Sequence, residues 1–388
     1  MGLGCSSQYP QLPQLNDLPI YNPLRSGPRF KVGALPELAA HSKSSPTVTK
    51  LWNNKLAFLS QGLSLYPKIL PAVDSEFIYQ ANHKGQLVAL NKQTGKKHWQ
   101  LKIAHAISAG PTIIGQSVLV GTQDAKIVSI NKNTGAVQWI VDVSSEPLAP
   151  PKGNEQIVIV NTIDGKVTAL NPKDGQLLWT YEGIIPNLML RGATSPLLTQ
   201  DIVLCGFANG KLVALHAQSG MLAWDKVIAV SKGRSDLHRM VDIRADLVID
   251  DGSVFVAAFQ GNLSKIELAT GQTKWQKEIS VYHTLAIDED AIYVTDANYH
   301  LWALDKVTGE TLWEQENLAE RYISAPTVLG DSILVGDRGG YIHWLNKHTG
   351  QIKSRYLVGN KIVSDLMVDD DMILVTTQNG KLSVFKVR

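Results

Sequence analysis

The histidines and the acidic clusters are the side chains of this chain that could bind a metal or carry out catalysis. The ten histidines are scattered along the 388 residues, and no pair has the spacing and neighbouring carboxylates of a zinc site. Three acidic runs, at residues 250–251, 288–290 and 369–371, look like calcium loops but lack the glycine and distal glutamate of such a loop. We therefore expect no metal and no cofactor, and we interpret the acidic runs as turns.

The two cysteines, at positions 5 and 205, have different predicted roles. Cys205 lies in the alternating run 202–205 and is expected to be a small buried packing residue rather than a nucleophile. Cys5 stands in Leu-Gly-Cys-Ser-Ser, which is similar to the end of a bacterial lipoprotein signal, where the cysteine carries a lipid. We expect lipidation at Cys5, against the alternative of a plain disordered N-terminus. With Cys5 acylated, no disulfide is expected.

A unit of about 40 residues recurs eight times between residues 79 and 388. Each unit contains short alternating apolar runs bounded by Gly, Asn and Asp, which is typical of strands joined by tight turns. Four such strands in about 40 residues correspond to one propeller blade. The sequence therefore predicts an all-β fold, an eight-bladed β-propeller of four-stranded antiparallel blades.

Six of the repeats carry a tryptophan four residues after the glycine of their last turn. The pairs are Gly95/Trp99, Gly135/Trp139, Gly175/Trp179, Gly220/Trp224, Gly271/Trp275 and Gly309/Trp313. The seventh repeat has Ser354 after Gly350. Because the tryptophan recurs at one register, we expect it to dock adjacent blades rather than to form a platform for sugars or nucleic acid. Trp302 and Trp344 lie outside this register, and the sequence leaves open whether they line the channel or simply pack.

The two chain ends are expected to close the ring. The eighth repeat ends at Arg388 after its third strand, whereas a lone strand-like run at 48–52, with Trp52, precedes the first repeat. Residues of about 48–58 would complete blade 8 and remove an open sheet edge. We therefore divide the chain into a Pro/Ser-rich tether at 1–47, with a reach of about 35 Å as a flexible coil, and a propeller at 48–388.

Two consecutive connections between blades are longer than the others. The glycines listed above are 45 and 51 residues apart where the extra residues fall, against 38 to 41 elsewhere, and these residues lie at 182–190 and 228–244. Such connections emerge on one face of a propeller, so the two loops should be neighbours. The first loop contains an apolar run from Ile184 to Leu190 followed by Arg191, a pattern that marks interaction sites. The alternative is that the run folds down onto the blade edge and Arg191 makes a structural ion pair.

Composition excludes some functional classes. Apolar residues make up 44% of the chain, charged residues 19%, and the net charge is +2, which describes an ordinary globular chain and not a nucleic-acid binder. No run of eighteen apolar residues is present, so we expect no membrane-spanning helix and membrane contact through a lipid anchor only.

The glycine–tryptophan repeats resemble those of quinoprotein alcohol dehydrogenases, whose eight blades hold pyrroloquinoline quinone over calcium. Those enzymes also carry long inserts and an adjacent pair of cysteines beside the cofactor, and this chain has two cysteines 200 residues apart, at 5 and 205. We therefore expect quinoprotein-like blades without the enzyme, and a PQQ-dependent dehydrogenase is the least favoured reading.

The whole chain from Cys5 is similar to the BamB family of outer-membrane assembly lipoproteins. Residues 186–196, Pro-Asn-Leu-Met-Leu-Arg-Gly-Ala-Thr-Ser-Pro, resemble the Leu-x-Leu-Arg-Gly segment of that family. Leu188, Leu190 and Arg191 match its positions. In the second loop Asp242 matches the first residue of the family's Asp-x-Asp pair, and Arg244 stands where the second aspartate is expected.

The resemblance implies a function without catalysis. These two loops would contact the POTRA domains of the β-barrel insertase BamA, and the ring would act as a scaffold in the assembly of outer-membrane proteins, with its other surfaces available to unfolded barrel substrates. It also implies a lipid-anchored position on the periplasmic face of the outer membrane of a Gram-negative bacterium. The alternative function is a general periplasmic propeller adaptor for another envelope partner.

Overall fold

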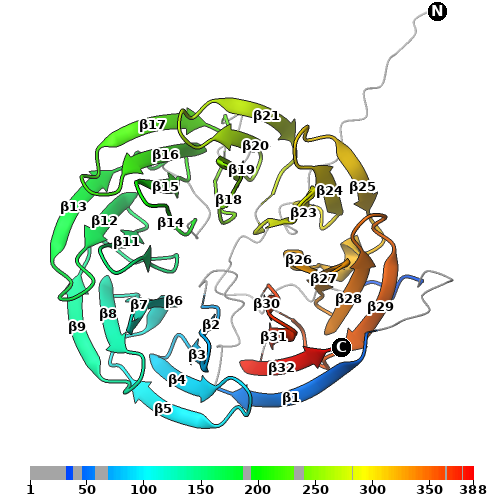
Figure 1. Ribbon diagram of the computed structural model, residues 1–388, viewed down its shortest axis with the longest axis horizontal. Helices are drawn as coiled ribbons and strands as arrows, with labels where there is room; N and C mark the ends of the chain where they lie inside the picture. Colours follow the sequence, from blue (N-terminus) through cyan, green and yellow to red (C-terminus); the bar gives the residue numbers. More distant parts are fainter. Residues whose placement is uncertain are drawn as a thin grey trace, which may run out of the picture.

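The fold is a closed ring of antiparallel sheets. The computed structural model describes residues 32–37, 46–56, 69–186, 194–230, 240–281, 283–362, 365–377 and 379–388. Within these residues, eight four-stranded sheets follow one another around a central axis. Figure 1 shows the first strand of each blade nearest the axis and the fourth strand at the rim. The eight-bladed propeller predicted from the repeats is therefore confirmed.

The strands of blades 1 to 4 follow the chain in order. They are β2 (Ala72–Val73), β3 (Phe77–Ala81), β4 (Gln86–Asn91) and β5 (Lys97–Lys102); β6 (Ile107–Ile114), β7 (Ser117–Thr122), β8 (Lys126–Asn131) and β9 (Val137–Asp142); β10 (Lys152–Gly153), β11 (Val158–Asn161), β12 (Lys166–Leu170) and β13 (Leu177–Glu182); and β14 (Leu197–Leu198), β15 (Ile202–Gly206), β16 (Lys211–His216) and β17 (Leu222–Val227).

Blades 5 to 8 continue in the same way, with one short 3-10 helix, η1 (Ala319–Arg321), before blade 7. Their strands are β18 (Val248–Asp250), β19 (Ser253–Ala257), β20 (Asn262–Glu267) and β21 (Thr273–Glu278); β22 (Ala286–Ile287), β23 (Ala291–Thr295), β24 (Leu301–Asp305) and β25 (Thr311–Gln315); β26 (Thr327–Leu329), β27 (Ser332–Gly336), β28 (Tyr341–Asn346) and β29 (Ile352–Leu357); and β30 (Met367–Asp369), β31 (Met372–Thr376), β32 (Lys381–Val387) and β1 (Val48–Lys55).

Blade 8 is built from both ends of the chain. Strand β1 pairs antiparallel with β32, from Val48 opposite Val387 to Lys55 opposite Lys381. Thr47 and Arg388 extend the ladder by exchanging two backbone hydrogen bonds of 3.1 Å. The expected closure of the ring is therefore confirmed, and β1 pairs the edge of β32 that would otherwise be open.

The repeated tryptophans dock each blade onto the next one. The indole N–H of Trp99, for example, donates to the carbonyl of Lys132 in blade 2 at 2.7 Å. Its ring lies against Gly135, where an added Cβ would come within 2.8 Å of the indole, so a side chain cannot be accommodated there. The same contact joins seven of the eight junctions: Trp52 to Gly95, Trp99 to Gly135, Trp139 to Gly175, Trp179 to Gly220, Trp224 to Gly271, Trp275 to Gly309 and Trp313 to Gly350. The docking role predicted for this register is confirmed.

The junction between blades 7 and 8 differs for a simple reason. Blade 8 takes its fourth strand from the N-terminus, so it has no third-to-fourth turn whose glycine a tryptophan could cover. Ser354 stands at the tryptophan position of blade 7, and Tyr356 instead packs edge-on against Phe385 of blade 8, with ring centroids 5.4 Å apart. The missing tryptophan thus follows from the way the ring is closed.

The acidic runs are turns that also join blades. Asp288 accepts hydrogen bonds from the backbone N–H groups of Asp290 and Ala291, at 3.0 and 2.8 Å. Its other oxygen lies 3.3 Å from the ammonium of Lys347 in the next blade. Equivalent lysine–aspartate pairs join blades 5 and 6, 8 and 1, and 1 and 2: Lys306–Asp250, Lys92–Asp369 and Lys132–Asp74.

The two tryptophans left open by the sequence both pack against apolar residues between blades. Trp344 is buried in a cluster shared by blades 7 and 8. The half-buried Trp302 packs against a cluster shared by blades 5 and 6 and donates its indole N–H to Asp296 at 3.1 Å. Among the described residues, no helix has the length and apolar character needed to cross a membrane.

Candidate interaction surface

The described ends of the two long loops are joined to each other. Thr194, at the end of the first loop, is fully buried, and its hydroxyl donates to the carbonyl of Ile243 in the second loop. The backbone N–H of Ser195 donates to a carboxylate oxygen of Asp246 at 2.9 Å. Gly206 on β15 leaves room for this contact, because a Cβ there would lie 2.4 Å from the side chain of Ile243. The two loops are therefore neighbours at their bases, as the repeat spacing predicts.

Leu188, Leu190 and Arg191 lie in the segment 187–193, outside the described residues. Ile184 and Ile185, just before this segment, are exposed. Ile184 is 76% exposed, and its carbonyl accepts a 2.9 Å hydrogen bond from the side-chain amide of Asn209. At the start of the second loop, Val230 is 61% exposed. The first part of the apolar run is thus exposed to solvent rather than folded onto the blade, which favours an interaction surface.

Asp242 occupies a structural position in the second loop. It is only 1% exposed, and its backbone exchanges hydrogen bonds with that of Phe259, at 2.7 and 3.4 Å. Pro147, Val281 and Ile362 form the corresponding isolated bridges at other junctions. Asp242 therefore presents almost no surface to a partner, and the half-buried Arg244, two residues further on, presents more.

Arg244 belongs to a group of charges drawn from several connections between blades. His283, in the next connection, is placed with its Nδ1 3.9 Å from Asp365, in the connection before blade 8. Burial lowers the pKa of His283 to about 4, and the positive charges of Arg244 and Arg338 act in the same direction, whereas Asp365 opposes them. The charge of Arg244 therefore contributes to the low pKa of His283, and this imidazole is neutral at pH 7.

Aromatic rings extend this group across blades 6 and 7. Tyr299 and Tyr322 meet edge-on with centroids 5.1 Å apart, and the guanidinium of Arg338 lies 5.1 Å from the ring of Tyr322. His283 is 6.2 Å from Tyr299. We use the name channel-side cluster for this group, which consists of His283, Tyr299, Tyr322, Arg338, Arg244 and Asp365. Its aromatic faces and guanidinium groups are suited to contacts with another protein chain.

Sequence reasoning missed the channel-side cluster, although one signal was present. Tyr299 has a positive φ of 65° and stands in the turn position that Gly85, Gly165 and Gly210 occupy in other repeats. A bulky residue with positive φ is strained, and such strain often marks a functional position. The other members could not be associated in advance, because each comes from a different connection.

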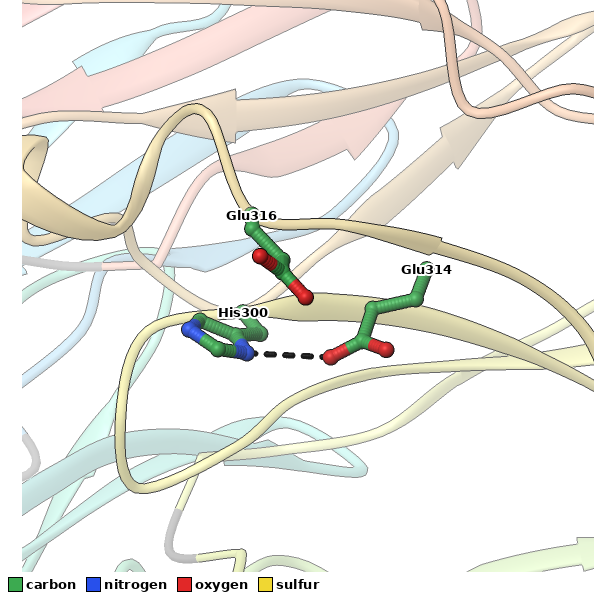
Figure 2. Close-up of side chains that lie close together, drawn as sticks. All are labelled: His300, Glu314 and Glu316. Carbon is green, nitrogen blue, oxygen red and sulfur yellow. Dashed lines mark hydrogen bonds and ion pairs between the residues drawn. The ribbon is translucent and has the colours of Figure 1, made fainter. Parts of the chain in front are cut away.

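A further polar group lies on blade 6. Figure 2 shows His300 and Glu314 facing each other, with Glu316 close by. His300 immediately precedes β24 and Glu314 lies on β25, and the His300 Nδ1 and Glu314 Oε1 atoms are 3.0 Å apart. The ligand atoms of the three residues lie within 4.8 Å of one another. The His300–Glu314 hydrogen bond accounts for the approach, and both glutamates are exposed. We assign no metal to this group, which arises from cross-strand pairing that sequence spacing does not reveal.

The two cysteines are the remaining candidates from the sequence. Cys205 is fully buried in β15, and burial raises the pKa of its thiol to about 12, so the reactive thiolate is suppressed. Cys5, the expected lipidation site, lies outside the described residues.

Comparison with known proteins places these features in a family. The family model described as "Outer membrane protein assembly factor BamB" matches residues 43–149, 83–315 and 307–388. An outer membrane protein assembly factor BamB from Legionella pneumophila is 37% identical over 83% of this chain and 84% of that protein. A protein of the same name from Pseudomonas aeruginosa is 36% identical over 89% of this chain and 91% of that protein. These names describe an assembly factor rather than an enzyme.

Solved structures agree with the sequence relatives. The crystal structure of BamB from Moraxella catarrhalis superposes with a TM-score of 0.79 and 26% identity, covering 88% of this chain and all of that one. Quinohemoprotein alcohol dehydrogenase from Comamonas testosteroni shares the fold, with a TM-score of 0.69 at 12% identity, over 87% of this chain and 76% of that one. The repeats, the closed ring and these relatives together show that the chain belongs to the outer membrane protein assembly factor BamB family.

Proposed function

We propose that this protein is a non-enzymatic scaffold of outer-membrane protein assembly, which binds the POTRA region of a BamA-like insertase through its two long loops. The observation that carries the proposal is the joining of the loop bases by Thr194, Ser195 and Asp246. The bases of two loops from successive junctions are thereby held next to each other. A partner that contacts both loop bases meets groups whose positions are set before binding, which reduces the entropic cost of association.

The chemistry of the surface supports a protein partner. Ile184 and Val230 expose apolar side chains where the described parts of the loops end, and Leu188, Leu190 and Arg191 lie in the segment that follows Ile184. Leucines and an arginine in the middle of an apolar patch are suited to act as anchors, with the polar surroundings excluding water. Arg244 adds a positive charge next to this surface, so we expect an acidic group on the partner opposite it.

We further propose that Asp242 positions the second loop instead of touching the partner. Its burial and its backbone pairing with Phe259 fit that role. The propeller would be held at the periplasmic face of the outer membrane by a lipid on Cys5. Unfolded outer-membrane proteins are a second class of partner, which would meet surfaces of the ring away from the loops.

The proposal is tested by recovery of the insertase from detergent-solubilised envelope. We expect tagged wild-type protein to recover it and a Leu190→Ala/Arg191→Ala variant to lose it, because each anchor contributes more than about 1 kcal/mol. A matched control, Leu312→Ala/Lys96→Ala, removes one exposed leucine and one exposed cation from blades 6 and 1. Circular dichroism checks that both variants are folded.

Each result of this experiment decides one point. Retention of the insertase by the Leu190/Arg191 variant would show that the site is wrong. Failure of the wild type to recover any insertase would favour the alternative, a propeller adaptor for another envelope partner. A quinone-like absorbance of the purified protein would instead indicate that it is a PQQ-dependent dehydrogenase.

A further inference from the structure

Residues 32–37, which we call the strap, bind to the outside of blade 7 ahead of the first strand. The guanidinium of Arg321 donates to the carbonyl of Gly33 at 2.6 Å, and Arg355 on β29 donates to the carbonyl of Pro36 at 2.8 Å. The N–H of Gly33 donates to the carbonyl of Glu320 at 2.9 Å. In Figure 1 the strap is the short blue segment beside β29. The chain is thus attached to blade 7 before it reaches β1.

The arginine that binds the strap is held in place by blade 7 itself. Arg321 is 5% exposed, and its Nε donates to Asp337 at 2.8 Å. His343 approaches the same carboxylate oxygen, with its Nε2 2.8 Å away. A Cβ on residue 339 would lie 2.1 Å from the Arg321 guanidinium, so Gly339 leaves the space that the side chain needs. The donor to the strap is therefore fixed by buried charge pairing and by the shape of the turn.

The close contact between the strap and blade 7 restricts which residue can stand at position 33. A Cβ on residue 33 would lie 2.6 Å from the Cβ of Glu320, so any side chain at this position would push the strap away. Its neighbour Ala34 is exposed. One position of the strap thus requires glycine, and the next one faces solvent.

We propose that the strap takes up force transmitted along the N-terminal segment and so protects the strand pairing that closes the ring. Without it, a pull on the N-terminal segment would act directly on Val48, the end of β1. The ladder starts at Thr47 and Arg388, continues with Val48 opposite Val387, and reaches Lys55 opposite Lys381 with one register shift between Lys50 and Trp52. The force would therefore peel β1 from β32 in successive pairs. With the strap bound, the force acts first on Arg321 and Arg355, and β1 carries none of it. The pairing of β1 with β32 would need this protection if residue 5 is held at a membrane. The test of the proposal requires neither lipid nor insertase.

Single-molecule pulling tests the proposal. In protein produced without the lipid, one handle is attached to the thiol of Cys5 and the other to a C-terminal peptide tag, and the buried Cys205 does not react. Val48 lies fifteen positions after Gly33 in the sequence, so release of the strap should lengthen the chain by up to about 50 Å, at about 3.4 Å per residue, before the ring opens. Gly33→Val should abolish this first step, and Arg355→Ala should lower its force. Ala34→Val, which adds the same kind of side chain next to Gly33 but toward solvent, should leave it unchanged.

Hydrogen exchange at equilibrium gives an independent readout. The amide of residue 33 should exchange about tenfold faster or more, relative to its intrinsic rate, in Gly33→Val and Arg355→Ala than in wild type and Ala34→Val, because charge-assisted hydrogen bonds hold the strap. The proposal is overturned if the wild type opens its ring with no earlier step, or if Gly33→Val retains that step. Equal exchange in all four proteins would also overturn it.

Discussion

Thr194→Val tests whether the hydrogen bond between the two loop bases organises the proposed surface. Valine has nearly the shape of threonine and loses only the hydroxyl that donates to the carbonyl of Ile243. Because Thr194 is fully buried, no water replaces the lost donor, and the carbonyl is left without this partner. The cost of such a loss is about 1–3 kcal/mol of unfolding free energy.

The expected changes follow from that free energy. With an unfolding entropy of about 2.1 cal/mol/K per residue and about 340 residues in the ring, the melting temperature should fall by about 1.5–4 °C. If the bond serves to hold the loops for the partner, the affinity should fall as well, by at most the same free energy, which corresponds to about 5–150-fold. Differential scanning calorimetry measures the first change, and isothermal titration with a soluble POTRA array measures the second.

Ser108→Ala is the matched control. Ser108 is also buried, and its hydroxyl donates at 2.7 Å to the carbonyl of Pro147, at the junction between blades 2 and 3. Ser108→Ala should therefore lower the melting temperature to a similar extent without changing the affinity. The reasoning is refuted if Thr194→Val melts with the wild type, or if both variants lose affinity equally, since the second result would reflect general destabilisation.

Two further predictions concern the ring and its charges. Trp139→Ala should lower the free energy of unfolding by about 3–5 kcal/mol, because it opens a cavity against Gly175 and removes the indole hydrogen bond to the carbonyl of Pro172. Urea unfolding measures this change. A loss below about 1 kcal/mol would contradict the docking role. His283 should make the free energy of unfolding depend on pH, because its pKa of about 4 in the folded state lies below the value of about 6.5 in the unfolded state. As the pH falls, the unfolded state binds the proton first. The free energy of unfolding should therefore decrease between about pH 6.5 and 4, by up to about 3 kcal/mol. His283→Gln should lack this part of the pH dependence, and an unchanged profile would refute the assignment.

The fold could be predicted because its signals repeat. Six repeats carry the same glycine and tryptophan spacing, so the copies reinforce one interpretation, and in the structure each of these tryptophans covers the glycine of the next blade. The absence at Ser354 is explained by the closure of blade 8. The channel-side cluster could not be predicted, since His283, Tyr322 and Asp365 come from three separate connections and meet only in the closed ring. The strap left no side-chain signature, because blade 7 binds its backbone carbonyls at Gly33 and Pro36.

The candidate site was predicted in part. The spacing of the repeats located the two long loops and their proximity, which depend on chain length alone. The resemblance proposed Asp242 as a contact residue, and its burial beside Phe259 follows from a backbone bridge that recurs at other junctions and that side-chain matching does not reveal. Leu188, Leu190 and Arg191 stay predictions that rest on the pattern of the first loop.

The central claim is that the first long loop touches the insertase, and site-specific photo-cross-linking tests it most directly. A photoreactive amino acid is placed at Leu190 in one variant and at Leu312, an exposed leucine of blade 6, in another. After irradiation of intact envelopes, we expect a covalent adduct with the periplasmic arm of the insertase from position 190 and none from position 312. No adduct at position 190, or equal adducts at both positions, would contradict the account.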